Sequence, residues 1–119
     1  NKVEDFGVGF FTKYGDGGVD LSPIADLMKS EVRKMGEELG VNSEIINAAP
    51  TDGLWADGRN DEDQLGATYD ELEWAMNYIE EKQAYSLTNR QKEVILLYNN
   101  FNQVNAHKMK SIPVYKIGE

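Results

Sequence analysis

The sequence predicts a predominantly helical fold. Apolar residues recur at helical spacing in four segments of the 119-residue chain. Three of these segments begin with Asn or Thr followed three residues later by Glu or Gln, which is the pattern of a capping box. No succession of short apolar runs indicates a buried parallel sheet. The length falls within the range of one domain with a modest core.

A first helix is predicted at the start of the chain, where Asn1 and Glu4 form the first capping box. Its apolar residues recur at i, i+3 and i+7, namely Val3, Phe6 and Phe10. Gly7 and Gly9 each cost this helix about 1 kcal/mol relative to Ala. A helix that retains both is expected to pack closely against another backbone or a ligand.

A glycine-dense loop follows, with the sequence Gly15-Asp16-Gly17-Gly18. Such a loop can turn several N–H groups toward an anion, and Lys13 would supply a positive charge. A tight turn between two helices is the alternative for these residues.

The second helix is marked at both ends. Ser22 is suited to the N-cap, Pro23 to the first helical position, and Gly40 to the left-handed residue that ends a helix. Its apolar stripe is Met28, Val32, Met35 and Leu39. A short helix is expected over residues 43–48. Residues 50–60 are rich in Gly, Asp, Asn and Pro, which predicts a loop.

Two further helices begin at the other capping boxes, Thr68 with Glu71 and Thr88 with Gln91. Their apolar faces are Leu72, Met76 and Ile79 in the first helix, and Val94, Leu97, Tyr98 and Phe101 in the second. In the tail, the alternation from Val114 to Ile117 predicts a short edge strand.

The charge balance and composition argue against several partners. Twenty-one acidic and twelve basic residues give a net charge of -9, and the basic residues are scattered, so nucleic-acid binding is not expected. No apolar run approaches the ~20 residues of a membrane helix, so no membrane association is expected. The absence of cysteine excludes disulfides and thiolate metal sites and favours a cytoplasmic location.

Several polar side chains are candidates for chemistry: Glu4, Lys13, Asp16, Asp20, Lys29, Thr51, His107 and Lys108. Taken singly, each also has an ordinary explanation as a helix cap, a solvated side chain or a turn residue. A His-rich metal site is excluded because the chain has one histidine. The run from Asp61 to Asp63 is interpreted as a solvated acidic face, since its spacing does not match a calcium loop.

Short motifs occur in a fixed order along the chain. They are Asn1-Lys2-Val3-Glu4, the run from Gly9 to Gly18, Asp20, Pro23, Lys29, Leu39-Gly40, Pro50-Thr51, Gly53-Leu54-Trp55, Asp61-Glu62, Leu65-Gly66, Tyr69 and His107-Lys108. In this order they resemble the C-terminal half of ammonia-dependent NAD synthetases, which belong to the N-type ATP pyrophosphatases. The resemblance covers residues 1 to about 72 and returns at 107–113.

The resemblance implies an α/β fold for the complete enzyme, with a Rossmann-like parallel sheet of the adenine-nucleotide hydrolase type. Residues 1–119 would form a predominantly helical C-terminal portion, with a helix plus Gly loop at 1–25, a lid-like loop at 50–66 and a helical region at 68–110. The implied reaction is the amidation of deamido-NAD to NAD with ATP and ammonia through an acyl adenylate. Mg²⁺ and a homodimeric state are implied as well.

Residues at matching positions acquire implied roles. Those implied to bind deamido-NAD are Lys13, Asp20, His107 and Lys108. Those implied to bind ATP are Lys29 and Thr51, and Glu4 is implied to bind Mg²⁺. The loop around Trp55 resembles a mobile loop that shields the adenylate from water.

The sequence departs from the family pattern in several places. Glu4 lies one residue farther from Gly9 than is usual, Met109 stands where an Arg is usual, and residues 80–105 have no assigned counterpart. The Ser-Gly-Gly-x-Asp-Ser phosphate loop of such enzymes does not occur in the sequence. The chain is therefore expected to need the N-terminal half of the enzyme and to be inactive alone.

Three alternatives remain open from the sequence. The first is the synthetase domain of a glutamine-dependent NAD synthetase, and the second is a related ATP pyrophosphatase with another carboxylate or carbonyl substrate. The third is a non-catalytic helical interaction module.

Overall fold

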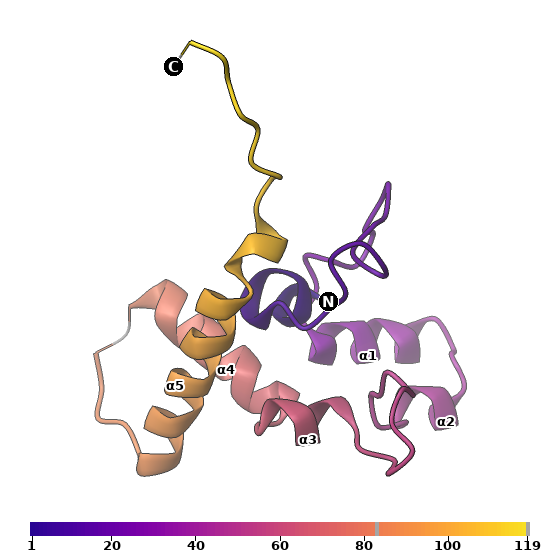
Figure 1. Ribbon diagram of the computed structural model, residues 1–119. Coiled ribbons are helices and arrows are strands. Elements are labelled where there is room, and N and C mark those ends of the chain that lie inside the picture. Colours follow the sequence, from indigo (N-terminus) through magenta and orange to yellow (C-terminus); the bar gives the residue numbers. More distant parts are fainter. Residues whose placement is uncertain (83, 119) are drawn as a thin grey trace.

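The computed structural model describes residues 1–82 and 84–118, and within them it is helical (Figure 1). The elements are a π-helix η1 (Val3–Val8), α1 (Lys29–Glu38), α2 (Ser43–Ile46), α3 (Asp61–Leu65), α4 (Tyr69–Glu81), α5 (Asn89–Val104) and a 3-10 helix η2 (Ala106–Met109). The expected region 68–110 contains residue 83, which lies outside the described residues. None of the described helices combines the length and the apolar character needed to cross a membrane.

The expected strand from Val114 to Ile117 is wrong. No strand occurs among the described residues, and the tail runs away from the helices (Figure 1). Val114, Tyr115 and Ile117 are each more than three-quarters exposed. Alternation of apolar residues produces a strand where a sheet edge is available to pair with it, and this part of the chain has none beside the tail.

The core lies where α4, α5 and η1 meet. Its buried apolar side chains are Val3, Val8, Met28, Leu65, Ala67, Tyr69, Leu72, Ala75, Met76, Val94 and Tyr98. The capping boxes at Thr68 and Thr88 are confirmed, because each threonine accepts a backbone N–H and its Glu or Gln partner closes the box. On the predicted faces, Leu72, Met76, Val94 and Tyr98 are buried, whereas Ile79 is exposed.

The close packing expected at Gly7 and Gly9 is confirmed. A Cβ at Gly7 would lie 3.1 Å from the Tyr98 ring, and one at Gly9 would lie 2.5 Å from the Asn105 Cβ. Gly9 also has φ of 64°, in the left-handed region that favours glycine. The end of η1 is therefore pressed against α5, and the Gly loop begins at that contact.

Helix α1 begins later than the sequence predicts. Its first residue is Lys29, not Pro23, and residues 22–27 form turns. The Lys2 N–H binds the Leu27 carbonyl oxygen at 2.8 Å, and Met28 is extended with ψ of 158°. These two features end the turn segment, so helix α1 starts at Lys29, the residue after Met28.

A buried carboxylate holds the new start of α1. Glu73 of α4 is 9% exposed and accepts the Ser30 N–H at 2.9 Å and the Ser30 hydroxyl at 2.6 Å. An N-terminal helix amide has no partner within its own helix, and a carboxylate there also suits the helix dipole. Helix α1 is thereby anchored to α4 with Lys29 at its first position.

The predicted apolar stripe of α1 is only partly buried. Met28 is 8% exposed, but Met35 is 46% and Leu39 75% exposed. At the other end of the helix, Gly40 has φ of 72°, as predicted. The short helix expected at 43–48 is confirmed as α2, with Asn42 as its cap.

Candidate functional site

Two carboxyl side chains and one tyrosine hydroxyl meet where η1, α3 and α4 come together. Glu4 lies in η1, Asp61 is the first residue of α3, and Tyr69 is the first residue of α4. The Tyr69 hydroxyl donates a hydrogen bond to Glu4 Oε1 and lies 3.5 Å from Asp61 Oδ2. Tyr69 is 2% exposed and Asp61 8%, so this contact is shielded from water.

Asp61 is not the solvated acid that the sequence suggested. Its Oδ1 atom is buried and has no hydrogen-bond partner among the residues that the structure describes. Burial raises the pKa of its carboxyl, and the negative charges of Glu4 and Asp52 raise it further, while Lys29 opposes them. Leu65, four residues later on the same helical face, is 1% exposed. That i, i+4 relation is the sequence signal that could have placed Asp61 inside.

Tyr69 acts as a neutral donor in this group. Burial raises the pKa of its phenol, and the hydrogen bond to Glu4 and the charge of that carboxylate raise it further. Its hydroxyl has a single hydrogen, which binds Glu4, so Asp61 receives no strong donor from it. Tyr69 carried no chemical prediction from the sequence.

Lys29 reaches the same group from α1. Its Nζ atom lies 5.2 Å from the centroid of the Tyr69 ring, in the range of a cation–π contact. Lys29 is half-buried, and its charge acts on the Asp61 carboxyl, where it opposes the rise in pKa that burial causes. The structure thus brings together two residues, Glu4 and Lys29, that the resemblance assigned to Mg²⁺ and ATP.

The Gly loop forms a tight turn that bonds to itself. The N–H groups of Gly15 and Gly17 bind the Thr12 carbonyl oxygen at 3.1 and 2.9 Å, and the N–H of Gly18 binds Gly15 at 2.9 Å. These amides are therefore occupied by loop carbonyls, which matches the tight-turn alternative. A Cβ at Gly17 would lie 2.6 Å from the Phe11 ring, so close approach explains that glycine.

Three of the residues assigned to deamido-NAD lie at this loop. Lys13 Nζ is 3.3 Å from His107 Nδ1, although the two residues are 94 positions apart. Lys108 Nζ donates to the Gly9 and Phe11 carbonyl oxygens. Asp20, the fourth, is exposed on the segment between the loop and α1.

Thr51 lies at the base of the loop over residues 50–60. Its hydroxyl accepts the Gly53 N–H at 3.1 Å, and it is 3.4 Å from the Arg59 carbonyl oxygen. The Asp61 N–H binds the Pro50 carbonyl oxygen at 2.9 Å, so the loop returns to its starting point at the buried acid. Thr51 therefore directly follows the residue whose carbonyl binds the backbone of Asp61.

The tip of this loop is exposed. Trp55 is 49% and Leu54 78% exposed. The Arg59 guanidinium lies 4.4 Å from the Trp55 ring and forms an ion pair with Asp57. These contacts are local to the loop and leave its apolar tip free to meet a ligand.

A cavity of about 210 Å³ separates the Gly loop from the loop over 50–60. It is lined by Phe10, Phe11, Thr12, Asp16, Asp52, Leu54, Gln64 and Lys108. Phe10 and Phe11 therefore line the same cavity as Leu54.

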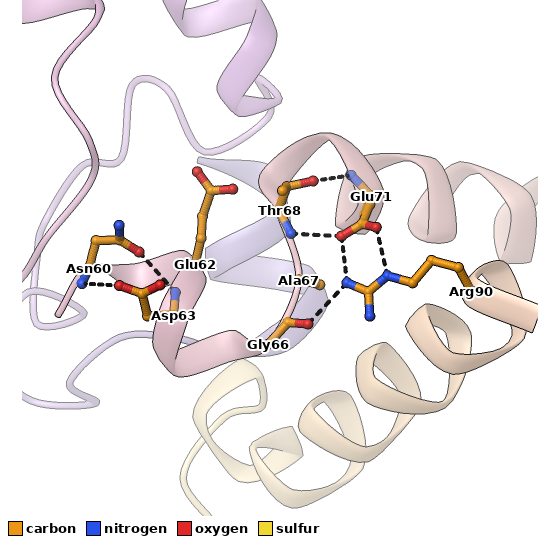
Figure 2. Close-up of a pocket in the computed structure, with 8 residues that line it drawn as sticks. All are labelled: Asn60, Glu62, Asp63, Gly66, Ala67, Thr68, Glu71 and Arg90. Atoms are coloured by element: carbon orange, nitrogen blue, oxygen red, sulfur yellow. Dashed lines mark hydrogen bonds and ion pairs between the residues drawn. The ribbon is translucent and has the colours of Figure 1, made fainter.

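A larger cavity of about 540 Å³ lies elsewhere and contains none of the predicted site residues. Figure 2 shows its lining, which is Asn60, Glu62, Asp63, Gly66, Ala67, Thr68, Glu71 and Arg90. Arg90 there donates two hydrogen bonds of 2.8 Å to Glu71, one to the Gly66 carbonyl and one to Glu93. Its charge is already paired, so this surface ties the start of α5 to the start of α4.

This tie predicts a pH-dependent stability. The hydrogen bonds from Arg90 hold the pKa of Glu71 at about 2. A lowered carboxyl pKa stabilises the fold at pH values above the ordinary carboxyl pKa near 4.5. That stabilisation is lost as the pH falls toward 2. Glu71→Gln should therefore be less stable than the parent in urea unfolding at pH 7, with the difference shrinking below pH 4. Exposed Glu37→Gln is the control, and a difference that stays constant with pH would contradict the tie.

The family model for NAD synthase matches residues 1–112. The chain belongs to the NAD synthase family. The full-length fold of this family is α/β, and the chain contributes a helical part of it. Membership in this family therefore explains why the described residues form helices without a sheet, and why the polar candidates lie on loops and helix starts.

Several curated relatives of the NAD synthase family resemble the chain, and each is named NH(3)-dependent NAD(+) synthetase. The protein of Methanosarcina acetivorans is 38% identical over 96% of this chain and 45% of the relative. That of Alkaliphilus metalliredigens is 39% identical over 92% of this chain and 40% of the relative. That of Methanococcoides burtonii is 56% identical over 56% of this chain and 25% of the relative. The chain thus spans less than half the length of these relatives.

Proposed function

We propose that this chain is the C-terminal portion of an ammonia-dependent NAD synthetase. The observation that carries the proposal is the meeting of Glu4 and Lys29 at the buried Tyr69 hydroxyl and ring, in a chain of the NAD synthase family. A carboxylate and an ammonium that contact the same tyrosine suit a magnesium-bound triphosphate. The names of the relatives give ammonia as their nitrogen donor.

In this proposal the reaction has two steps. The nicotinate carboxylate of deamido-NAD attacks the α-phosphorus of ATP, and pyrophosphate leaves. Ammonia then forms a bond to the acyl carbon while the bond to AMP breaks, which yields the amide of NAD, AMP and one proton. Both steps concentrate negative charge that the site must offset, and the acyl adenylate must be kept from water.

Residues of this chain fit these tasks. Lys29 would bind phosphate oxygens of ATP as a half-buried ammonium, and the Thr51 hydroxyl would add a hydrogen bond. Lys13 with His107, and Asp20 with them, would bind deamido-NAD, and Lys108 would belong to the same site. The lid-like segment 50–66, which is a loop that ends in α3, would cover the adenylate, with Leu54 and Trp55 as its exposed apolar tip.

Mg²⁺ fits the acidic group at η1. Glu4 would hold it, since carboxylate oxygens are hard ligands, and the buried Asp61 Oδ1, which has no hydrogen-bond partner among the described residues, belongs to the same acidic group. No group of three or more metal-ligating side chains occurs within residues 1–82 and 84–118. That suits Mg²⁺, which commonly binds one or two carboxylates and completes its shell with phosphates and water. When bound, it would neutralise charge on the triphosphate.

The proposal extends to the assembly. A Ser-Gly-Gly-x-Asp-Ser phosphate loop does not occur in the 119 residues, so the N-terminal half of the enzyme would supply it. A homodimer and a cytoplasmic location are part of the same proposal. Neither a nucleic acid nor a membrane is proposed as a partner, given the charge of -9.

A binding experiment with a matched control tests the proposal. In the enzyme that contains this chain, Lys13→Ala should weaken deamido-NAD binding by about 10- to 100-fold in calorimetry, the range expected for one charge-assisted hydrogen bond. Lys34→Ala, an exposed lysine of α1, should leave binding unchanged. The 119 residues alone should form no NAD from deamido-NAD, ATP and ammonia. Failure of the intact enzyme to bind deamido-NAD would contradict the proposal.

A further inference from the structure

Two asparagines near the end of α5 bind the last carbonyl groups of η1. Asn102 Nδ2 donates to the Gly7 carbonyl oxygen at 2.7 Å, and Asn105 Nδ2 donates to the Val8 carbonyl oxygen at 2.9 Å. The final carbonyls of a helix have no N–H donor within it and need donors from elsewhere. Figure 1 shows η1 lying directly beside the end of α5, where these donors originate. The end of η1 is thus capped by side chains that come almost 100 residues later.

Lys108 extends this series of hydrogen bonds to the loop that follows η1. Asn102, Asn105 and Lys108 are spaced three residues apart, so they follow one another along the same side of the chain. Lys108 Nζ donates to the Gly9 carbonyl oxygen at 3.0 Å and to the Phe11 carbonyl oxygen at 2.8 Å. The same ammonium lies 5.5 Å from the centroid of the Phe11 ring. Two of its three N–H groups are therefore taken by backbone.

These contacts fix the segment that carries Lys13. The chain leaves Gly9 in a left-handed conformation, is bound again at Phe11, and reaches Lys13 two residues later. Lys13 Nζ then lies 3.3 Å from Nδ1 of His107, the neighbour of Lys108. The short segment η2 thus holds the loop through Lys108 and contacts the Lys13 ammonium through the preceding residue, His107.

We propose that Lys108 is a positioning residue that serves the deamido-NAD site through the loop over residues 9–13. Its ammonium fixes the Gly9 and Phe11 carbonyls, and Lys13 is thereby held against His107 before any ligand arrives. A ligand that binds Lys13 then loses less loop entropy on binding. The substrate named here rests on the proposed function, but the effect on the loop does not.

Hydrogen exchange tests the loop directly in the full-length enzyme without ligand. Lys108→Met should speed exchange of the Thr12, Gly15 and Gly17 amides by about tenfold or more, because their loop loses its two anchors. Lys108→Arg should restore most of the protection, since a guanidinium can also donate to two carbonyls. Lys110→Met, at an exposed lysine two residues on, is the matched control and should change nothing.

Kinetics separate positioning from direct contact. With positioning, Lys108→Met raises the KM for deamido-NAD about tenfold with little change in kcat, and it also loses loop protection in the free enzyme. A raised KM with loop protection unchanged overturns the proposal and assigns Lys108 to direct binding. If Lys108→Met does not fold, Lys108→Gln, which keeps a donor for one carbonyl, replaces it with an intermediate loss of protection expected.

The two proposals fail in different ways. An enzyme that does not bind deamido-NAD contradicts the proposed function, while the exchange data still decide whether Lys108 orders the loop. An enzyme that binds deamido-NAD with exchange unaffected by Lys108→Met contradicts the positioning role alone.

Discussion

Gly9→Ala is expected to lower the free energy of unfolding by about 3 kcal/mol. Two penalties contribute to this loss. Gly9 has φ of 64°, where any residue with a Cβ is strained, and the new Cβ would lie 2.5 Å from the Cβ of Asn105. Asn105 cannot simply move aside, because it also binds the Val8 carbonyl oxygen. The substitution therefore pushes η1 away from α5.

Gly40→Ala is the matched control for this prediction. Gly40 has φ of 72°, but its Cβ position has nothing within 4 Å. It should lose only the backbone part, about 1 kcal/mol. Urea unfolding of both variants measures the difference. Equal losses for the two would show that the contact of Gly9 with α5 adds nothing to stability.

Local signals in the sequence predicted the starts of α2, α4 and α5, and a long-range contact accounts for the late start of α1. Thr68 and Thr88 cap their helices with side chains three residues away, so each box is complete within one turn. Pro23 is also suited to a helix start, but the helix begins at Lys29, where Glu73 binds the first turn from 43 positions away. No pattern within residues 22–29 contains that information.

The candidate site divides in the same way. The resemblance singled out Glu4 and Lys29, and the structure brings both to one place. Asp61 and Tyr69, the residues through which they meet, were missed because their importance comes from burial. An acid within an acidic run and a tyrosine at a helix start look ordinary in a sequence. The packing of α3 on α4 and η1 makes them the centre of the group.

The Gly loop illustrates a third kind of difference. Its glycines predicted either an anion-binding turn or a tight turn, and composition alone does not separate the two. The choice depends on where the N–H groups point. In the structure, the amides of Gly15 and Gly17 bind the Thr12 carbonyl, and the charge that could meet an anion resides on Lys13. Side chains would therefore supply the recognition that the backbone was expected to supply.

Tyr69→Phe is expected to lower the free energy of unfolding by about 2 kcal/mol, the loss of a hydrogen bond from a buried hydroxyl to a charged acceptor. The phenylalanine ring keeps the packing and the contact with Lys29, so the loss isolates the hydroxyl. Without it, the Glu4 carboxylate has lost its donor and faces Asp61, whose own Oδ1 is already unpaired in the part of the chain that is described. The hydroxyl that lies between the two acids would then be lost, and the repulsion between them would increase.

Tyr98→Phe is the control for this substitution. Tyr98 is 6% exposed, and its ring packs on Gly7 away from the acidic group. Under the proposed function, Tyr69→Phe should also raise the KM for ATP several-fold in the intact enzyme, because Glu4 is no longer held toward Lys29, whereas Tyr98→Phe should not. Unfolding in urea and ATP kinetics measure both effects. If the two variants behave alike, the Tyr69 hydroxyl does not organise Glu4, and the acidic group loses its place at the centre of the site.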